Sequence, residues 1–166
     1  MKNLNEFLKE SSIDEDTKYI LLKNDTIKVN GHTLYRIQAV KDFGSVKEGS
    51  LGGYIESEDN LSHEDTCWVF NDAKVYGDAK VTNYAILMDN AEVYDNAIVG
   101  VNSLIRDNAK VYGNARVYGN SAKIYGDAEV YGDAEIDSKA LIYGKAKVYG
   151  NAKVDYNVLG DTKVNK

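Results

Sequence analysis

A six-residue unit, aliphatic-x-x-x-small-x, repeats from Cys67 to Lys153 and is interrupted by a single inserted residue, Ser121. Fifteen such hexads follow one another, which is typical of a solenoid and constrains the fold more than any other feature of the chain. The aliphatic positions are Val69, Val75, Val81, Leu87, Val93, Val99, Ile105, Val111, Val117, Ile124, Val130, Ile136, Ile142, Val148 and Val154. The small positions are Cys67, Ala73, Ala79, Ala85, Ala91, Ala97, Ser103, Ala109, Ala115, Ala122, Ala128, Ala134, Ala140, Ala146 and Ala152.

Each hexad predicts a very short strand followed by a corner. In the unit 75–80, the β-branched Val75 suits an inward strand position, and the Gly77-Asp78 pair tolerates the positive φ of a tight corner. Three such edges close a triangle of 18 residues, and successive triangles stack at about 4.8 Å. We therefore expect an all-β parallel β-helix of about five triangular rungs, roughly 24 Å tall.

The inserted residue Ser121 falls beside the Gly119-Asn120 corner. An insertion within a strand would turn its inward side chains outward, because side chains alternate between the two faces. The sequence therefore predicts that Ser121 is a bulge in a corner and leaves the strands in phase.

The hexad run resembles the hexapeptide-repeat, left-handed parallel β-helix proteins, and this resemblance covers about 60% of the chain. The left hand is implied by the resemblance alone. Upstream, Leu34-Tyr35-Arg36-Ile37, 52–56, 60–62 and Cys67-Trp68-Val69 resemble an uncharacterised subgroup that is often carried by phages and prophages. That resemblance implies a phage origin and a role against a host system, and it brings no known catalytic residues.

The region before the repeats predicts a small α+β cap, which would cover the open first rung of the solenoid. Residues 3–10 form an amphipathic helical pattern with Leu4, Phe7 and Leu8 on one side. Strand-like segments flank Asn30-Gly31, a strong hairpin signal. The predicted domains are an N-terminal cap, a β-helix and a C-terminal cap or tail, at 1–54, 55–157 and 158–166.

Stacking in threes assigns the outward residues to three faces. The tyrosine face carries a predicted ladder, and the residues preceding its aliphatic positions alternate in charge. Cross-strand pairing alone explains such a ladder; a flat surface that stacks on bases, sugars or a partner's side chains is the alternative. The candidate partner-binding residues are Tyr76, Tyr94, Tyr112, Tyr131 and Tyr149, and the alternating charges are Lys74, Glu92, Lys110, Glu129 and Lys147.

The second face, here the apolar face, carries more large apolar side chains than solvent exposure would favour. Either the helix at 3–10 folds back over it, or it is an interface with a partner or a second copy. The candidate interface residues are Trp68, Phe70, Ile86, Met88, Leu104 and Arg106. The third, polar face begins at Lys80 and Thr82 and is expected to face solvent; its pattern breaks at 98–102.

The composition restricts the partners and the compartment. With 26 acidic and 20 basic residues, the formal charge is −6, which disfavours general attraction to nucleic acid or an acidic membrane. The single cysteine, Cys67, excludes an internal disulfide and is expected to be buried. No apolar stretch matches a signal peptide or membrane span. We expect a soluble protein in the cytoplasm, that of the bacterial host if it is phage-encoded.

The sequence predicts no catalytic constellation, cofactor or metal. Acyltransferases of the hexapeptide-repeat class use a histidine base, and a related branch binds zinc through three histidines, but this chain has only His32 and His63. His32 lies far along the sequence from the repeats. His63, next to Glu64 and Asp65, is either a polar capping residue at the first turn or the one residue worth testing as a base or ligand.

The sequence is compatible with three functions. The first is a non-enzymatic binding protein that uses an outer face to dock on or sequester a protein partner, as a phage-encoded inhibitor of a host defence protein would. The second is an acyltransferase-like enzyme with a histidine in a subunit cleft. The third is a structural protein that self-assembles through its rungs. We also expect a homo-oligomer.

Overall fold

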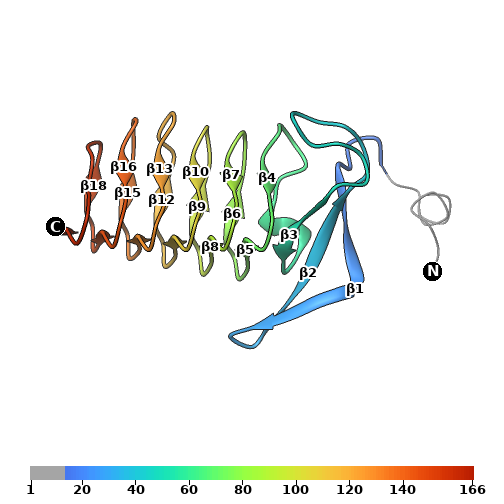
Figure 1. Cartoon of the computed structure of the whole chain (residues 1–166), viewed down its shortest axis with the longest axis horizontal. Coiled ribbons are helices and arrows are strands. Elements are labelled where there is room, and N and C mark those ends of the chain that lie inside the picture. The colour runs from blue at the N-terminus through green and yellow to red at the C-terminus, as the bar shows by residue number, and fades with distance from the viewer. Residues whose placement is uncertain (1–13) are drawn as a thin grey trace.

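The computed structural model describes residues 14–166, and their fold is an all-β parallel β-solenoid with almost no helix (Figure 1). The predicted fold class is therefore confirmed. The helix predicted at residues 3–10, with Leu4, Phe7 and Leu8, lies outside the described residues. No helix of the described part of the chain is long and apolar enough to cross a membrane.

Three sheets run along the solenoid, one for each predicted face. The tyrosine-face sheet contains β3 (Leu51–Ile55), β5 (Lys74–Val75), β8 (Glu92–Val93), β11 (Lys110–Val111), β14 (Glu129–Val130), β17 (Lys147–Tyr149) and β19 (Lys163–Asn165). The apolar-face sheet contains β4 (Trp68–Val69), β7 (Ile86–Leu87), β10 (Leu104–Ile105), β13 (Lys123–Ile124) and β16 (Leu141–Ile142). The polar-face sheet contains β6 (Lys80–Val81), β9 (Ile98–Val99), β12 (Arg116–Val117), β15 (Glu135–Ile136) and β18 (Lys153–Val154).

The core consists of the two repeated positions of the hexad. Every aliphatic position and every small position from Cys67 to Val154 is at most 1% exposed. Backbone N–H groups of one coil donate to carbonyls of the next, as from Lys74 to Ala91 at 2.9 Å. The hydrophobic interior and the hydrogen-bond ladder thus depend on stacking of neighbouring coils, as in other solenoids.

The solenoid has about six coils, one more than the hexads predict. Pairing continues beyond the regular repeats at both ends, with spacings of 20 and 16 residues in place of 18. A change of two residues keeps the alternation of inward and outward side chains, so the stack continues although the hexad is lost. The added pairs are Ile55 with Val75, Leu61 with Val81, Ile142 with Val158 and Val148 with Val164.

The predicted corner bulge at Ser121 is confirmed. Ser121 has a φ of 84°, and β10 and β13 stay in register, with Ile105 opposite Ile124. The coil that contains the insertion is one residue longer than its neighbours, and its inward side chains keep their phase.

The N-terminal cap is an antiparallel hairpin that extends the tyrosine-face sheet. Strand β1 (Tyr19–Val29) pairs with β2 (His32–Ala39), and the turn residues Asn30 and Gly31 have φ values of 50° and 86°, as a two-residue hairpin requires. Strand β2 also pairs antiparallel with β3, which pairs in parallel with β5. The cap and the tyrosine face are consequently one continuous sheet, and the hairpin slants back beside the first coils (Figure 1).

Candidate functional site: the outer faces of the solenoid

The predicted tyrosine ladder is present and its rings stack on one another. The four successive pairs have ring centroids 4.9–5.1 Å apart and interplanar angles of 1–6°. That spacing follows from the parallel register of the coils, which places the same side-chain type at the same position in every coil. The rings from Tyr76 to Tyr149 therefore use their faces for contacts within the protein.

Polar contacts tie the ladder to the charged row beside it. The Tyr112 hydroxyl donates to Glu129 Oε2 at 2.8 Å, and Lys147 Nζ donates to Glu129 Oε1 at 2.8 Å. The bond from Lys147, with the one from Tyr112, lowers the pKa of Glu129, although burial acts against it. Burial raises the pKa of Tyr76 to about 12 and also raises that of Tyr112, so these phenols remain hydrogen-bond donors at neutral pH.

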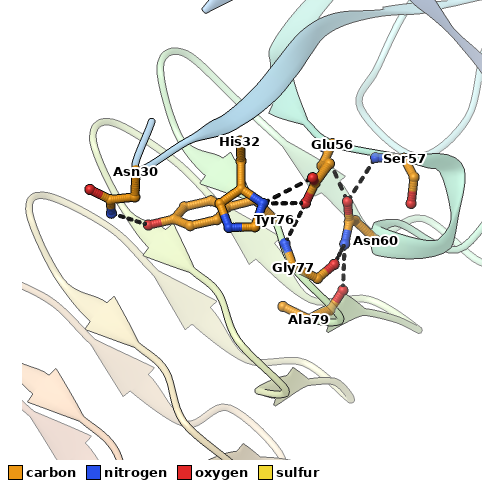
Figure 2. A network of polar contacts seen from close by, with 8 residues as sticks. All are labelled: Asn30, His32, Glu56, Ser57, Asn60, Tyr76, Gly77 and Ala79. Atoms are coloured by element: carbon orange, nitrogen blue, oxygen red, sulfur yellow. Dashed lines mark hydrogen bonds and ion pairs between the residues drawn. The ribbon is translucent and has the colours of Figure 1, made fainter. Parts of the chain in front are cut away.

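The hairpin turn holds the first ring of the ladder in place (Figure 2). Asn30 Nδ2 donates to the Tyr76 hydroxyl at 3.2 Å, and the His32 ring lies 5.2 Å from that of Tyr76. His32 Nδ1 is 2.9 Å and 3.0 Å from the two Glu56 oxygens, and the Gly77 N–H donates to Glu56 at 2.7 Å. Burial opposes ionisation of Glu56, but the bonds from His32 and Gly77 prevail and lower its pKa.

Two expectations are corrected by this arrangement. Tyr76 is only 2% exposed, so it is covered by the chain itself and offers no surface to a partner. His32 is distant in sequence from the repeats, but the hairpin brings it against them, a placement that nothing in the sequence around Asn30-Gly31 reveals. The ladder has no open ring face between Tyr94 and Tyr131 on which a base or sugar could stack.

Within residues 14–166, the cap covers the start of the apolar face and leaves the following coils partly exposed. Trp68 is 1% exposed, with edge-on contacts to Tyr19 at 6.0 Å and Phe43 at 5.2 Å. Trp68 is therefore a core residue, which corrects its assignment to an interface. The other apolar candidates, Phe70, Ile86, Met88 and Leu104, remain partly exposed, and Arg106 is exposed.

A buried polar cluster that the sequence did not predict closes the same end of the solenoid. Lys18 is 1% exposed, and its Nζ donates to the Cys67 carbonyl at 2.9 Å and lies 3.3 Å from Cys67 Sγ. Burial lowers the pKa of Lys18 and raises that of Cys67. Cys67 is buried as predicted, whereas no periodicity marks Lys18, because its partners are mainly backbone carbonyls that the fold alone brings near.

His63 has the contacts of a capping residue. Its ring stacks on Tyr19 with centroids 4.2 Å apart, and its Nδ1 accepts a hydrogen bond from the Lys18 N–H at 3.2 Å. Burial lowers the pKa of His63, although Glu58 acts in the opposite direction. These contacts support the interpretation of His63 as a polar cap at the first turn. Among the described residues, no group of three or more His, Cys, Asp or Glu side chains could hold a metal ion.

The polar face carries a shallow pocket near its C-terminal end. The pocket has a volume of about 340 Å³ and is lined by Tyr118, Glu135, Asp137, Lys153, Val154 and Asp155. Glu135 accepts hydrogen bonds from the Tyr118 hydroxyl at 3.0 Å and forms an ion pair with Lys153 at 3.0 Å. These polar groups satisfy one another, as expected for a solvated face.

Comparison with known protein families gives a match to part of the repeat region. A family model described as the YdcK β-solenoid repeat matches residues 109–121, which lie in β11, β12 and the corner that follows. The chain is a β-solenoid repeat protein. No curated protein matches this β-solenoid chain.

Proposed function

We propose that this chain is a non-enzymatic binding protein that docks a protein partner on the apolar face of its solenoid. The observation that supports this proposal is the contrast along that face. The cap covers Trp68, whereas Ile86, Met88 and Leu104, in the next two coils, present partly exposed apolar side chains from neighbouring strands of one sheet. Partly exposed apolar side chains that form a patch are typical of a binding surface.

The tyrosine face supports the proposal less well. Its rings are stacked on one another, and Glu92 and Glu129 form ion pairs with Lys110 and Lys147, so these contacts already stabilise the fold. A partner could reach only ring edges there. The ladder would instead support the apolar face indirectly, since both sheets share one core.

The finer proposal is that the partner is a host defence protein and that this chain is a phage product that blocks it. It rests on the resemblance of the segments around 34–37 and 67–69 to phage-carried proteins. The experiment expresses the chain in bacteria that carry defined defence systems and measures phage plating. Restored plating in one defence background supports the proposal, and plating unchanged in every background rejects the inhibitory role.

The docking face is tested with the partner identified in that background. Met88→Asp with Leu104→Asp should abolish binding of the purified partner, because charges would then oppose apolar contact. The matched control is Ile98→Asp with Tyr118→Asp on the polar face, which should bind as the native chain does. Retained binding by the Met88 and Leu104 variant contradicts the assignment of the face.

A further inference from the structure

Acidic side chains are distributed unequally around the solenoid. Each face with its preceding corner can be compared over the same four coils. The apolar face, over 83–88, 101–106, 119–125 and 138–143, contains no Asp or Glu and three cations. The tyrosine face, over 89–94, 107–112, 126–131 and 144–149, contains five acids and three cations. The polar face, over 95–100, 113–118, 132–137 and 150–155, contains five acids and two cations.

The formal charge is therefore +3 for the apolar face, −2 for the tyrosine face and −3 for the polar face. We call the first of them the acid-free strip. Its three cations are Arg106, Lys123 and Lys139, all exposed. Within residues 14–166, Lys123 and Lys139 form no ion pair, and Arg106 lies 3.7 Å from Asp107 at the edge of the strip. A positive strip on a chain of charge −6 favours an anionic partner.

Apolar and aromatic side chains lie among these cations. Tyr84 is 50% exposed and Tyr143 is 46% exposed, and Leu104 and Leu141 are half-buried beside them. A partner that fits the strip therefore presents aliphatic side chains together with carboxylates. Arg, Tyr and Met, all present here, are residue types enriched in protein interfaces.

Val101, at a corner of the strip, is held in an unfavourable backbone conformation. It has a φ of 56°, and it is the one β-branched residue among the positive-φ residues described, the others being Gly, Asn, Asp and Ser. The equivalent corner of the preceding coil carries Asn83, with a φ of 57°. Valine is disfavoured there because its branched side chain crowds the backbone. Strain of this kind is found at functional sites, and here it places an aliphatic side chain at the edge of the strip.

We propose that the acid-free strip binds an acidic, aliphatic segment of a partner protein, and that Val101 is a contact residue kept at the expense of stability. This proposal rests on the proposed binding function and adds the chemistry of the partner. A bilayer also presents negative charge, but its broad surface would meet the acidic flanks of the strip. A single peptide segment is narrow enough to follow the strip alone.

The test uses the full chain and a fluorescein-labelled peptide of glutamate, leucine and valine. About eight residues, roughly 26 Å when extended, are enough to span four coils at about 4.8 Å. Fluorescence anisotropy should show binding that weakens with added salt, and the same peptide with glutamine for glutamate should bind less. Arg106→Glu with Lys123→Glu should weaken binding roughly tenfold or more, because both attractions become repulsions. Lys28→Glu with Lys80→Glu, an equal charge change elsewhere, should not.

Val101→Asn separates contact from stability. It should unfold at a higher urea concentration than the native chain, because asparagine tolerates the left-handed conformation, and it should bind the peptide more weakly. A lower urea midpoint or unchanged binding overturns the role of Val101. Three results would overturn the strip proposal: no binding of the peptide by the native chain, equal loss of binding in the Lys28 and Lys80 variant, or strip-dependent binding of phosphatidylserine vesicles in place of the peptide. A partner whose binding is lost with Met88→Asp and Leu104→Asp but kept with Arg106→Glu and Lys123→Glu leaves the proposed docking function standing and overturns only the strip proposal.

Discussion

The tyrosine face and the acid-free strip share one core and differ in how they use their outward side chains. On the tyrosine face, Tyr94, Tyr112 and Tyr131 stack on one another, and Glu129 pairs with Lys147. On the acid-free strip, Lys123 forms no ion pair within residues 14–166, and the backbone of Val101 has an unfavourable φ of 56°. The first surface uses its outward side chains mainly in contacts within the fold. The second has fewer such contacts, chiefly the pair of Tyr125 with Tyr143 and the position of Arg106 over the Tyr125 ring, and its lysines are available to a partner.

This difference indicates that the most regular surface of a repeat protein need not be its binding surface. Stacking identical coils places identical side chains next to each other, which rewards residues that pair with their own kind or with an opposite charge. A ladder of identical, stacked side chains is therefore expected on a regular face. A binding surface is instead expected where the repeat is broken, as at Val101 and Asn102.

The largest expected effect is at the centre of the ladder. Tyr112→Ala removes two stacked pairs and the bond to Glu129, and should lower the free energy of unfolding by about 2 to 3 kcal/mol. Tyr143→Ala, on the acid-free strip, removes one tilted pair with Tyr125 and should cost less than about 1 kcal/mol. Urea denaturation of both variants measures the difference. Equal losses would show that the two surfaces contribute alike to the fold.

The second effect concerns the hairpin that covers Tyr76, the first ring of the ladder. Glu56→Ala removes the acceptor of the Gly77 N–H and the partner of His32, and should cost about 1 kcal/mol. Amide hydrogen exchange should become faster in β1 and β2 and at Tyr76, while exchange in β10 and β13 stays unchanged. Glu48→Ala, which replaces an exposed carboxylate in the same cap, is the control. Uniformly faster exchange in both variants would argue against a local closure of the ladder.

His63 packs against Tyr19 of the cap, which in turn contacts Trp68, and the stability of this end of the solenoid should depend on pH. Burial lowers the pKa of His63 below its usual value of 6.5, so the folded chain binds this proton less readily than the unfolded chain does. The free energy of unfolding should therefore fall as pH decreases from 6.5 through the lowered pKa. His63→Gln should lessen that decrease when unfolding is measured across this range. An unchanged pH dependence in the variant would contradict the role of His63.

The smallest effect is expected for the cations. Lys123→Ala on the acid-free strip should change the free energy of unfolding by no more than about 0.5 kcal/mol, as for most exposed substitutions. Lys147→Ala on the tyrosine face removes an ion pair of 2.8 Å and should lower the urea midpoint slightly but measurably. A larger loss for Lys123 than for Lys147 would reverse the comparison.

The sequence predicted the fold where the physics is local and repeated. The inward aliphatic residues, the corner at Ser121 and the ladder all follow from a period of six residues and three edges in a coil. It did not predict the pairing of Ile55 with Val75 or of Ile142 with Val158, because spacings of 20 and 16 residues replace the regular 18 there.

Contacts between distant segments were the other limit. Three contacts depend on where the cap folds back. They are the burial of Trp68 under Tyr19, the pairing of Lys18 with Cys67 and the position of His32 on Tyr76. No pattern within either segment encodes these contacts. The acid-free strip, in contrast, is visible in the sequence once the coils are aligned, because Asp and Glu are absent from the same positions in four successive coils.

An NMR titration of the isotopically labelled chain with the acidic peptide tests directly whether the acid-free strip is the binding surface. We expect backbone amide shifts to gather at Val101, Leu104 and Lys123, and the amides of Tyr94, Tyr112 and Tyr131 to stay unchanged. Shifts that gather at the tyrosines and leave the strip unchanged would contradict that assignment.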